Sequence, residues 1–172
     1  EWEFGGYPWW LQNVKGMEIR RDNPEFLKYT KAYIDRLYKE VGSLQCTKGG
    51  PIVMVQCENE FGSYVAQRKD IPLEEHRAYN AKIKQQLADA GFNVPLFTSD
   101  GSWLFEGGAT PGALPTANGE SDIENLKKVV SRRKRSVYGC RILSGLAVAL
   151  GRAVPANRSF RNCSSNREVS AK

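Results

Sequence analysis

Histidine and closely paired cysteines are scarce in this sequence, and their scarcity argues against several kinds of site. The 172 residues contain one histidine, His76, which argues against a Ser-His-Asp triad and against a metal centre built from several histidines. The four cysteines form no CxxC pair and have no metal-ligand spacing. Cys57 lies inside an apolar run, so we expect a buried and unreactive thiol. No metal or other cofactor is implied.

Long apolar runs are also missing, and acidic residues almost disappear near the C-terminus. The apolar run at 142–154 is too short to cross a bilayer, so we expect no membrane partner. The net charge of +6 belongs to one end of the chain: residues 1–130 hold 15 Lys+Arg and 18 Asp+Glu, whereas residues 131–172 hold 10 Lys+Arg and a single acid, Glu168. Because the basicity is confined to the tail, we expect no nucleic-acid partner.

The first predicted element is a helix that begins at Pro24. Asp22 or Asn23 is suited to cap it, Pro24 is suited to its first turn, and Gly42 is a plausible stop. Apolar side chains follow at helical spacing and predict the buried stripe. These residues are Phe26, Tyr29, Tyr33, Leu37 and Val41.

Two short apolar runs predict strands that are buried on both faces, at residues 52–56 and 94–98. A helix after Pro72 lies between them, with Leu73, Tyr79, Ile83 and Leu87 on one stripe and Gly91 as its stop. A loop rich in Gly and Pro runs to Pro115, and a further helix is expected at 123–130. This alternation indicates an α/β fold with a parallel sheet.

The chemistry is most visible directly after the first predicted strand, where the sequence reads Glu58-Asn59-Glu60. Charged residues in this position lie at the carboxyl end of a parallel sheet, where α/β barrels place their active sites. Glu58 and Glu60 would point to the same side if the strand extends that far. A carboxyl group beside an amide suits sugar chemistry, because the acid can protonate a glycosidic oxygen while the amide binds a neighbouring hydroxyl.

Two other segments place acids and aromatic rings in comparable positions. Residues 1–11 combine Glu1 and Glu3 with three tryptophans around a Gly-Gly turn, and Asp100 ends the second predicted strand, with Trp103 following it. Flat aromatic rings match the apolar faces of sugars, although core packing is expected for at least one of the tryptophans. Together the three segments predict a cleft lined by carboxylates.

These residues are similar to the β-galactosidases of glycoside hydrolase family 35. The resemblance rests on Glu-Trp-Glu-Phe-Gly-Gly at 1–6, on Val-Gln-Cys-Glu-Asn-Glu-Phe-Gly-Ser-Tyr at 55–64 and on Pro-Leu-Phe-Thr-Ser-Asp-Gly at 95–101. It covers residues 1–130. The resemblance implies a (β/α)8 TIM barrel and retaining cleavage of terminal β-galactosyl residues, with a galactoside as the substrate.

The resemblance also implies a role for individual residues. Glu60 corresponds to the general acid/base at the end of the family's fourth strand. Asn59 corresponds to the residue that contacts the sugar 2-hydroxyl, and Glu1 to a residue that binds galactose hydroxyls after the third strand. The family's nucleophile is another Glu, at the end of the seventh strand.

The chain departs from the family at both ends. The family's first two strands would precede Glu1, and a complete barrel needs about 250 residues, so we interpret residues 1–130 as an incomplete barrel from the end of the third strand to the helix of the sixth unit. Nothing after Val130 resembles the seventh strand. Residues 131–172 are predicted to be a basic, disordered tail outside the family pattern.

A shift of reading frame offers an explanation for this tail. Residues 132–155 can be back-translated with permitted codons and re-read one nucleotide later as Gly-Gly-Asn-Gly-Pro-Tyr-Met-Val-Ala-Glu-Phe-Tyr-Pro-Gly-Trp-Leu and onward. That reading resembles the family's nucleophile segment, and the codon of its Glu straddles Arg141 and Ile142. Our hypothesis is that the tail is out-of-frame peptide.

The sequence therefore predicts a β-galactosidase-type fragment that is inactive for lack of its nucleophile. One alternative is a non-catalytic galactoside-binding remnant that uses Glu1, Asn59 and the tryptophans; another is an interaction protein with a basic tail. A second Glu able to approach Glu60 would separate the first two readings, and the genomic reading frame decides the third. The residues do not indicate a cellular location, although members of the family are commonly exported.

Overall fold

The computed structural model describes residues 6–101, 103–118, 138–141 and 146–148. Their order is a 3-10 helix η2 (Trp9–Asn13), helix α1 (Pro24–Val41), two further 3-10 turns, strand β1 (Val55–Asn59), helices α2 (Phe61–Gln67) and α3 (Leu73–Ala90), strand β2 (Leu96–Asp100), the short helix α4 (Phe105–Gly108) and strand β3 (Leu114–Asn118). Strands β4 (Tyr138–Arg141) and β5 (Leu146–Val148) follow. The two 3-10 turns are η3 (Gly42–Leu44) and η4 (Cys46–Lys48).

One sheet runs through the molecule in the order β1-β2-β3-β4-β5. Strands β1 to β4 pair in parallel and β5 pairs antiparallel with β4. Helices α2 and α3 connect β1 to β2, and α4 connects β2 to β3. This alternation confirms the predicted α/β class, and parallel strands joined through helices are the building units of α/β barrels.

Helix α1 begins and ends where the sequence predicts. The Asn23 side chain accepts a hydrogen bond from the Phe26 N–H at 3.0 Å, and Pro24 occupies the first turn. The predicted stripe is partly wrong, because Tyr33 is 67% exposed and Ile34 is buried instead. Tyr33 belongs to the aromatic surface between α1 and residues 6–11, whereas Ile34 faces the sheet-side cluster with Cys57 and Leu87.

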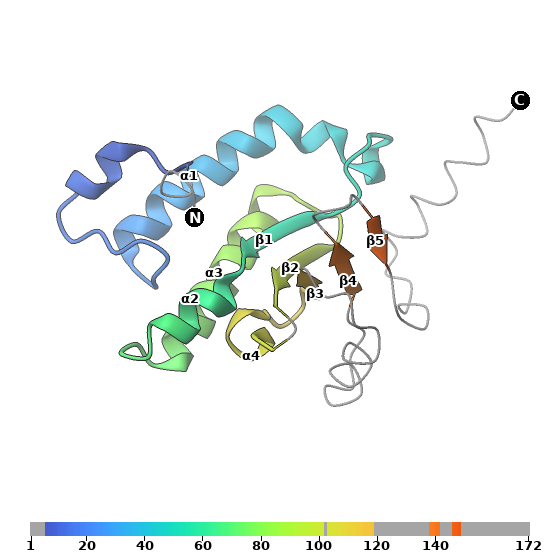
Figure 1. Ribbon diagram of the computed structural model, residues 1–172. Helices are drawn as coiled ribbons and strands as arrows, with labels where there is room; N and C mark the ends of the chain where they lie inside the picture. The colour runs from blue at the N-terminus through green and yellow to red at the C-terminus, as the bar shows by residue number, and fades with distance from the viewer. Residues whose placement is uncertain (1–5, 102, 119–137, 142–145, 149–172) are drawn as a thin grey trace, which may run out of the picture.

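Helix α3 packs against both α1 and β1 (Figure 1) and supplies side chains to two core clusters. Tyr79 and Ile83 pack with Phe26 of α1 and Phe61 of α2, while Leu87 packs with Ile34 and Cys57. The predicted stripe of α3 is confirmed at its three buried members, and Leu73 at the first turn is only half-buried. The helix stops at Gly91, whose φ of 112° is the left-handed conformation that glycine accepts readily.

Both predicted strands begin later than their apolar runs. The ladder pairs Val55 with Leu96, so that Ile52 and Val94 precede the strands. Ile52 instead forms an isolated bridge with Gln45. Two helices and a strand lie where the sequence predicted only a loop or gave no element: α2 directly after Glu60, α4, and β3, which contains Pro115.

The predicted helix at 123–130 lies outside the described residues, as does most of the predicted tail. Residues 138–141 and 146–148 of that segment form strands β4 and β5, which the sequence did not predict. The division of the chain at residue 130 stays a prediction. No helix among the described residues is long and apolar enough to cross a membrane.

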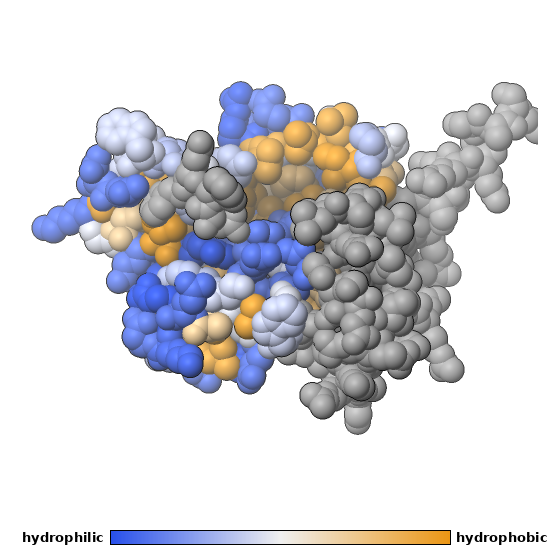
Figure 2. Space-filling model, viewed as in Figure 1, coloured by the Kyte–Doolittle hydropathy of each residue, from blue (hydrophilic) through white to orange (hydrophobic). Residues whose placement is uncertain are grey.

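Strand β1 is an edge strand, and apolar side chains lie beside it. Among the described strands it pairs only with β2. Val53 and Leu44, which precede it in the chain, are 50% and 45% exposed. Figure 2 shows hydrophobic surface over the region where Figure 1 places β1 and the neighbouring end of α1. An unpaired strand edge next to apolar surface favours pairing with another chain.

We therefore expect this 172-residue chain to self-associate through the β1 edge. Val53→Lys should lower the average mass measured by light scattering at a fixed concentration, because a charge near a strand edge opposes edge-to-edge pairing. Gln12→Lys adds the same charge at an exposed position of η2 and should leave the association unchanged. A monodisperse monomer for the unsubstituted chain would contradict this expectation.

Candidate active site

The carboxyl ends of three parallel strands bring polar side chains together at one end of the sheet. Asn59 ends β1, Asp100 ends β2 and Asn118 ends β3. The register aligns these ends, because Asn59 pairs with Ser99 and Asp100 pairs with Ala117. Glu60 follows Asn59 directly. The predicted positions of Asn59, Glu60 and Asp100 at the strand ends are thus confirmed, whereas Glu1 lies outside the described residues.

Glu60 turns the chain out of the sheet. Its φ and ψ of 48° and 36° are left-handed, a conformation that costs a non-glycine residue on the order of 1–3 kcal/mol. Its N–H still donates to Ser99 O at 2.7 Å, and helix α2 begins at the next residue. The turn sends the carboxylate across the strand ends, where Oε1 accepts a hydrogen bond from Nδ2 of Asn118.

A bulge in β1 explains why Glu58 does not share this direction. Between the paired positions Gln56 and Asn59, β1 advances three residues while β2 advances two, from Phe97 to Ser99. The extra residue breaks the alternation of side chains, and the strand ends before Glu60. The prediction that Glu58 and Glu60 point to the same side is therefore wrong: Glu58 contacts Arg20 and Tyr79, whereas Glu60 contacts Asn118.

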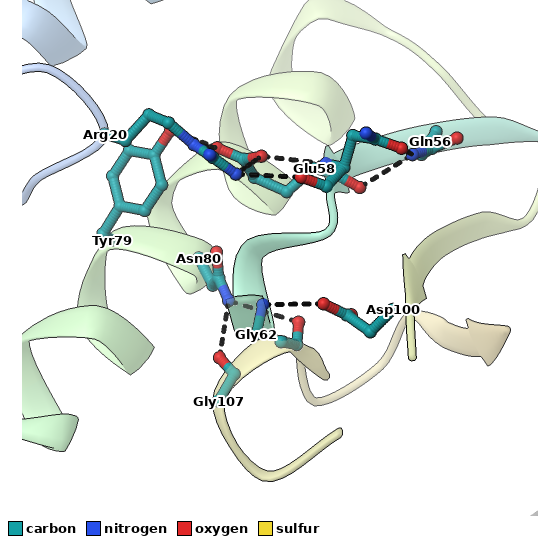
Figure 3. A network of polar contacts seen from close by, with 10 residues as sticks. Arg20, Gln56, Glu58, Gly62, Tyr79, Asn80, Asp100 and Gly107 are labelled. Atoms are coloured by element: carbon teal, nitrogen blue, oxygen red, sulfur yellow. Dashed lines mark hydrogen bonds and ion pairs between the residues drawn. The ribbon is translucent and has the colours of Figure 1, made fainter. Parts of the chain in front are cut away.

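Arg20 and Glu58 form a mostly buried ion pair beside this strand end (Figure 3). Arg20 donates from Nε to Glu58 Oε1 at 3.1 Å and from Nη2 to Glu58 Oε2 at 2.8 Å. The Tyr79 hydroxyl donates to the same Oε1 at 2.8 Å. The guanidinium also lies 5.1 Å and 5.2 Å from the ring centres of Phe61 and Tyr64. The cost of burying the two charges is thus offset by their mutual attraction and by well-directed hydrogen bonds to the Glu58 carboxylate.

The pKa values around Glu58 follow from this burial. Burial, together with the Glu58 charge, raises the pKa of Tyr7 to about 12 and that of Tyr79 well above its usual value. Burial opposes the charge of Arg20, but the Glu58 carboxylate outweighs it and the pKa of Arg20 is raised. Both tyrosines therefore stay neutral, and Tyr79 serves as a hydrogen-bond donor to the carboxylate.

The ion pair fixes the backbone of Asn59. The Asn59 N–H donates to Glu58 Oε2 at 2.8 Å, and its carbonyl oxygen accepts from Arg20 Nη2 at 2.9 Å. The Asn59 side chain is oriented by Gln56, whose Nε2 donates to Asn59 Oδ1 at 2.9 Å. Both the backbone and the amide plane of Asn59 are therefore defined by neighbouring residues.

Asp100 is a second buried carboxylate at the strand ends. It is 1% exposed, and its Oδ1 accepts a hydrogen bond from the Gly62 N–H at 2.7 Å. Burial raises its pKa to about 6, with further contributions from the Glu58 and Glu60 charges; the Gly62 hydrogen bond and the Arg20 charge act in the opposite direction. Asp100 therefore carries a charge at neutral pH only at a cost in stability.

The remaining predicted features have simple structural outcomes. Cys57 is buried, and burial raises the pKa of its thiol to about 12, which confirms the expected unreactive cysteine. Trp9 and Trp103 are each 75% exposed, whereas Leu11 belongs to the core. Within the described ranges, no group of three or more His, Cys, Asp or Glu side chains is arranged to hold a metal ion.

An aromatic hollow of about 420 Å³ lies between α1 and residues 6–11, lined by Tyr7, Trp10, Tyr29, Tyr33 and their neighbours. Its lining includes none of the strand-end residues. The candidate site is therefore the strand-end group of Asn59, Glu60, Asp100 and Asn118, and not this hollow.

The geometry agrees with what comparison with known proteins finds. The sequence profile of the glycosyl hydrolases family 35 matches residues 1–137. A β-galactosidase of Xanthomonas manihotis is 41% identical over 119 residues, which are 69% of this chain and 18% of that protein. The human β-galactosidase-1-like protein 2 is 38% identical over 124 residues, or 72% of this chain and 18% of that protein.

A more distant relative has the same pattern of coverage. A probable β-galactosidase E of Aspergillus fumigatus is 34% identical over 123 residues, or 71% of this chain and 12% of that protein. The chain thus spans less than a fifth of the length of these relatives. Parallel strands joined through helices, with a carboxyl group and an amide at their carboxyl ends, define an α/β protein. More specifically, it belongs to glycosyl hydrolases family 35, as its sequence resemblance implied.

The raised pKa of Asp100 predicts a pH-dependent effect of Asp100→Asn on stability. Below about pH 4 both the folded and the unfolded states hold the proton, so the carboxyl group costs nothing. Between pH 4 and 6 only the folded state retains it, and stability falls as pH rises. Above pH 6 the full cost of up to about 3 kcal/mol is present, since the pKa rises from 3.8 to about 6.

Relative to its effect at pH 4, Asp100→Asn should therefore stabilise the fold at pH 8. Urea unfolding of dilute protein at the two pH values measures this difference. Asp89→Asn, at an exposed position of α3, is the matched control and should show a smaller difference. Equal effects of Asp100→Asn at both pH values would contradict the assigned burial of charge.

Proposed function

We propose that this chain is the acid/base part of a retaining β-galactosidase-type glycoside hydrolase. The observation that carries the proposal is the placement of Asn59 at the end of β1 and of Glu60 directly after it, with the Glu60 carboxylate directed across the strand ends to Asn118. Membership of family 35 and relatives named β-galactosidases support the same substrate class. The substrate would be a terminal β-linked galactoside.

In this proposal Glu60 acts twice. As an acid it protonates the glycosidic oxygen of the leaving group, and as a carboxylate it then removes a proton from the water that attacks the galactosyl-enzyme intermediate. The hydrogen bond from Asn118 holds the side chain across the strand ends, where a sugar would lie.

Asn59 and Glu1 would bind the sugar. Because Gln56 donates to Asn59 Oδ1, the amide nitrogen of Asn59 lies on the opposite side of the amide group, where it can donate to the sugar 2-hydroxyl. Glu1 would accept hydrogen bonds from galactose hydroxyls, a role taken from the family pattern alone.

The nucleophile would have to come from elsewhere in a complete enzyme. A retaining mechanism needs a second carboxylate roughly 5–5.5 Å from the first. Among the described residues, two other acids lie near Glu60 in the network: Glu58 is held by Arg20 and Tyr79, and Asp100 is held by Gly62. We therefore propose that the 172-residue chain is an incomplete barrel without a nucleophile and is catalytically inactive.

A non-catalytic galactoside-binding protein is the second candidate. It is favoured by the exposed position of Asn59 and by Trp103, which is 75% exposed in the loop after β2. Binding without turnover would use the same amide and an aromatic platform for the apolar face of the sugar.

The first test is turnover by the chain itself. With nitrophenyl β-galactoside, we expect the 172-residue chain to release no nitrophenol above background, because no galactosyl intermediate can form. The comparison is an extended protein, defined as residues 1–130 preceded by the family's first strands and continued after Val130 in the shifted reading frame. The extended protein should be active, and turnover by the 172-residue chain would refute the proposed lack of a nucleophile.

A second test addresses the role of Glu60 in the extended protein. Glu60→Gln should lower kcat/KM by about 10²- to 10⁴-fold for galactosides with poor leaving groups and much less for dinitrophenyl galactoside, whose leaving group needs little protonation. Glu106→Gln, at a side chain that is 79% exposed, is the control and should leave both rates unchanged. Equal losses on both substrates would show that Glu60 is not the acid.

A further inference from the structure

Helix α2 begins at a residue that cannot cap it. Glu60 occupies the N-cap position, and its side chain makes no capping hydrogen bond because the carboxylate is directed to Asn118. The first N–H groups of a helix have no partner within the helix and normally receive one from the N-cap side chain. In the proposed function the Glu60 side chain is needed at the sugar, so the helix start requires another acceptor.

Asp100 supplies that acceptor from a different strand. Its Oδ1 lies 2.7 Å from the N–H of Gly62, the second residue of α2. The carboxylate is 1% exposed and comes from the end of β2, directly next to β1 in the sheet. Figure 3 shows the Asp100 side chain pointing at the Gly62 nitrogen, with no dashed contact to the Arg20 and Glu58 pair.

Two glycines leave the space that this carboxylate occupies. A Cβ atom at Gly108 would lie 2.0 Å from Asp100 Oδ1, and a Cβ at Gly62 would lie 2.4 Å from Leu104 O and 3.0 Å from the same Oδ1. Cβ contacts under 3.0 Å essentially never occur, so a side chain at residue 108 would collide with the carboxylate, and one at residue 62 would collide with the Leu104 carbonyl and crowd the carboxylate. The φ angles of Gly62 and Gly108 are not positive, so close approach and not backbone freedom accounts for glycine here.

A third element closes the arrangement. Asn80 of α3 donates from Nδ2 to Gly107 O at 3.4 Å and to Gly108 O at 3.3 Å, and it is 2% exposed. These hydrogen bonds hold α4 against Asp100. The carboxylate thus lies where β2, α2 and α4 meet, and α3 packs against α4.

We propose that Asp100 is a positioning residue for Glu60: it caps helix α2 in place of the Glu60 side chain and thereby holds the left-handed turn that directs the Glu60 carboxylate to the strand ends. The inference rests on the proposed role of Glu60. The carboxyl group acts through the Gly62 N–H and needs no contact with substrate. Its burial against the Glu58 and Glu60 charges costs stability, and a retained cost of this kind is expected where the geometry serves a site.

The test uses the extended protein and the ratio of kcat/KM for dinitrophenyl galactoside to that for methyl galactoside. Asp100→Ala removes the acceptor and should lower the methyl galactoside value by about 10- to 100-fold, with a loss of less than about 3-fold for the dinitrophenyl substrate, because a misplaced acid affects only leaving groups that need a proton. Asp100→Asn retains an acceptor oxygen for Gly62 and should keep the ratio within about 3-fold of the unsubstituted protein.

Gly108→Ala provides an independent variant, because its new methyl group displaces the carboxylate and leaves its charge in place. It should shift the ratio in the same direction as Asp100→Ala. Glu106→Gln on the exposed side of α4 is the control and should leave the ratio unchanged. Amide exchange at Gly62 should be faster in Asp100→Ala than in Asp100→Asn.

The outcomes separate the two proposals. An extended protein without any galactosidase activity would overturn the proposed function. If that protein is active and Asp100→Ala and Gly108→Ala lower both substrates equally, or leave the ratio unchanged, Asp100 has only a general structural role and the positioning inference is wrong. Loss of folding in one variant is recognised by circular dichroism, and the other variant then decides.

Discussion

The left-handed turn at Glu60 is the constraint on which the arrangement of the candidate site depends. A strand that continued straight would leave the residue-60 side chain in the alternation of β1, and helix α2 would not begin at Phe61. The turn costs on the order of 1–3 kcal/mol for a residue with a side chain. It is held by the hydrogen bond from the Glu60 N–H to Ser99 O, by Arg20 at the preceding carbonyl and by Asp100 at the first turn of α2. Three contacts from two separate segments, the chain before α1 and strand β2, thus maintain one unfavourable backbone conformation.

The charges at this site are unevenly compensated, and the imbalance has a physical consequence. Glu58 shares a two-point ion pair with Arg20 and a further hydrogen bond from Tyr79, so its burial is well matched. For Asp100 the compensation is weaker, since the Gly62 N–H and the Arg20 charge only partly offset burial and the neighbouring carboxylates. Asp100 consequently keeps its proton up to a higher pH than an ordinary aspartate does. In mild acid, where Asp100 is neutral, the fold therefore avoids the cost of burying its charge.

Local chemistry made part of this fold predictable from the sequence. The Asn23-Pro24 start, the Gly91 stop and the buried stripe of α3 depend on residues close together in the chain, and each was recovered. The strand positions were displaced by two or three residues, because apolar character at Ile52 and Val94 marks burial and not the start of the ladder. Strand β3 was missed because Pro115 and the glycines before it resemble a loop, although a Pro at the second residue of a short strand can be accommodated.

The candidate site could also be predicted only in part, because several of its contacts join residues far apart in the chain. Asn59, Glu60 and Asp100 could be placed at the sheet edge because they directly follow apolar runs. The bulge in β1 could not be read from the sequence, so Glu58 was assigned to the wrong side. Arg20, Tyr79 and Asn118 were missed as partners because they lie between 21 and 58 residues from their contacts in the chain. Only the two arginines before the Asn23-Pro24 start and the lone Asn after the Gly/Pro loop were available as signals, and neither is specific.

The contacts described for Glu60 and the residues flanking it all come from residues 20–118. Arg20 precedes α1, Ser99 and Asp100 belong to β2, and Asn118 ends β3. A barrel enzyme that divides its chemistry between the fourth and seventh strands must position two carboxylates from distant parts of the chain. In the proposed function Glu60 would be the first of these carboxylates, and its described contacts come from neighbouring units, so its geometry would depend on local packing. This local support is contained in a chain that covers less than a fifth of the length of its relatives. It also implies that the two halves of such a site can change independently, since substitutions around the second carboxylate would leave the anchors of Glu60 in place.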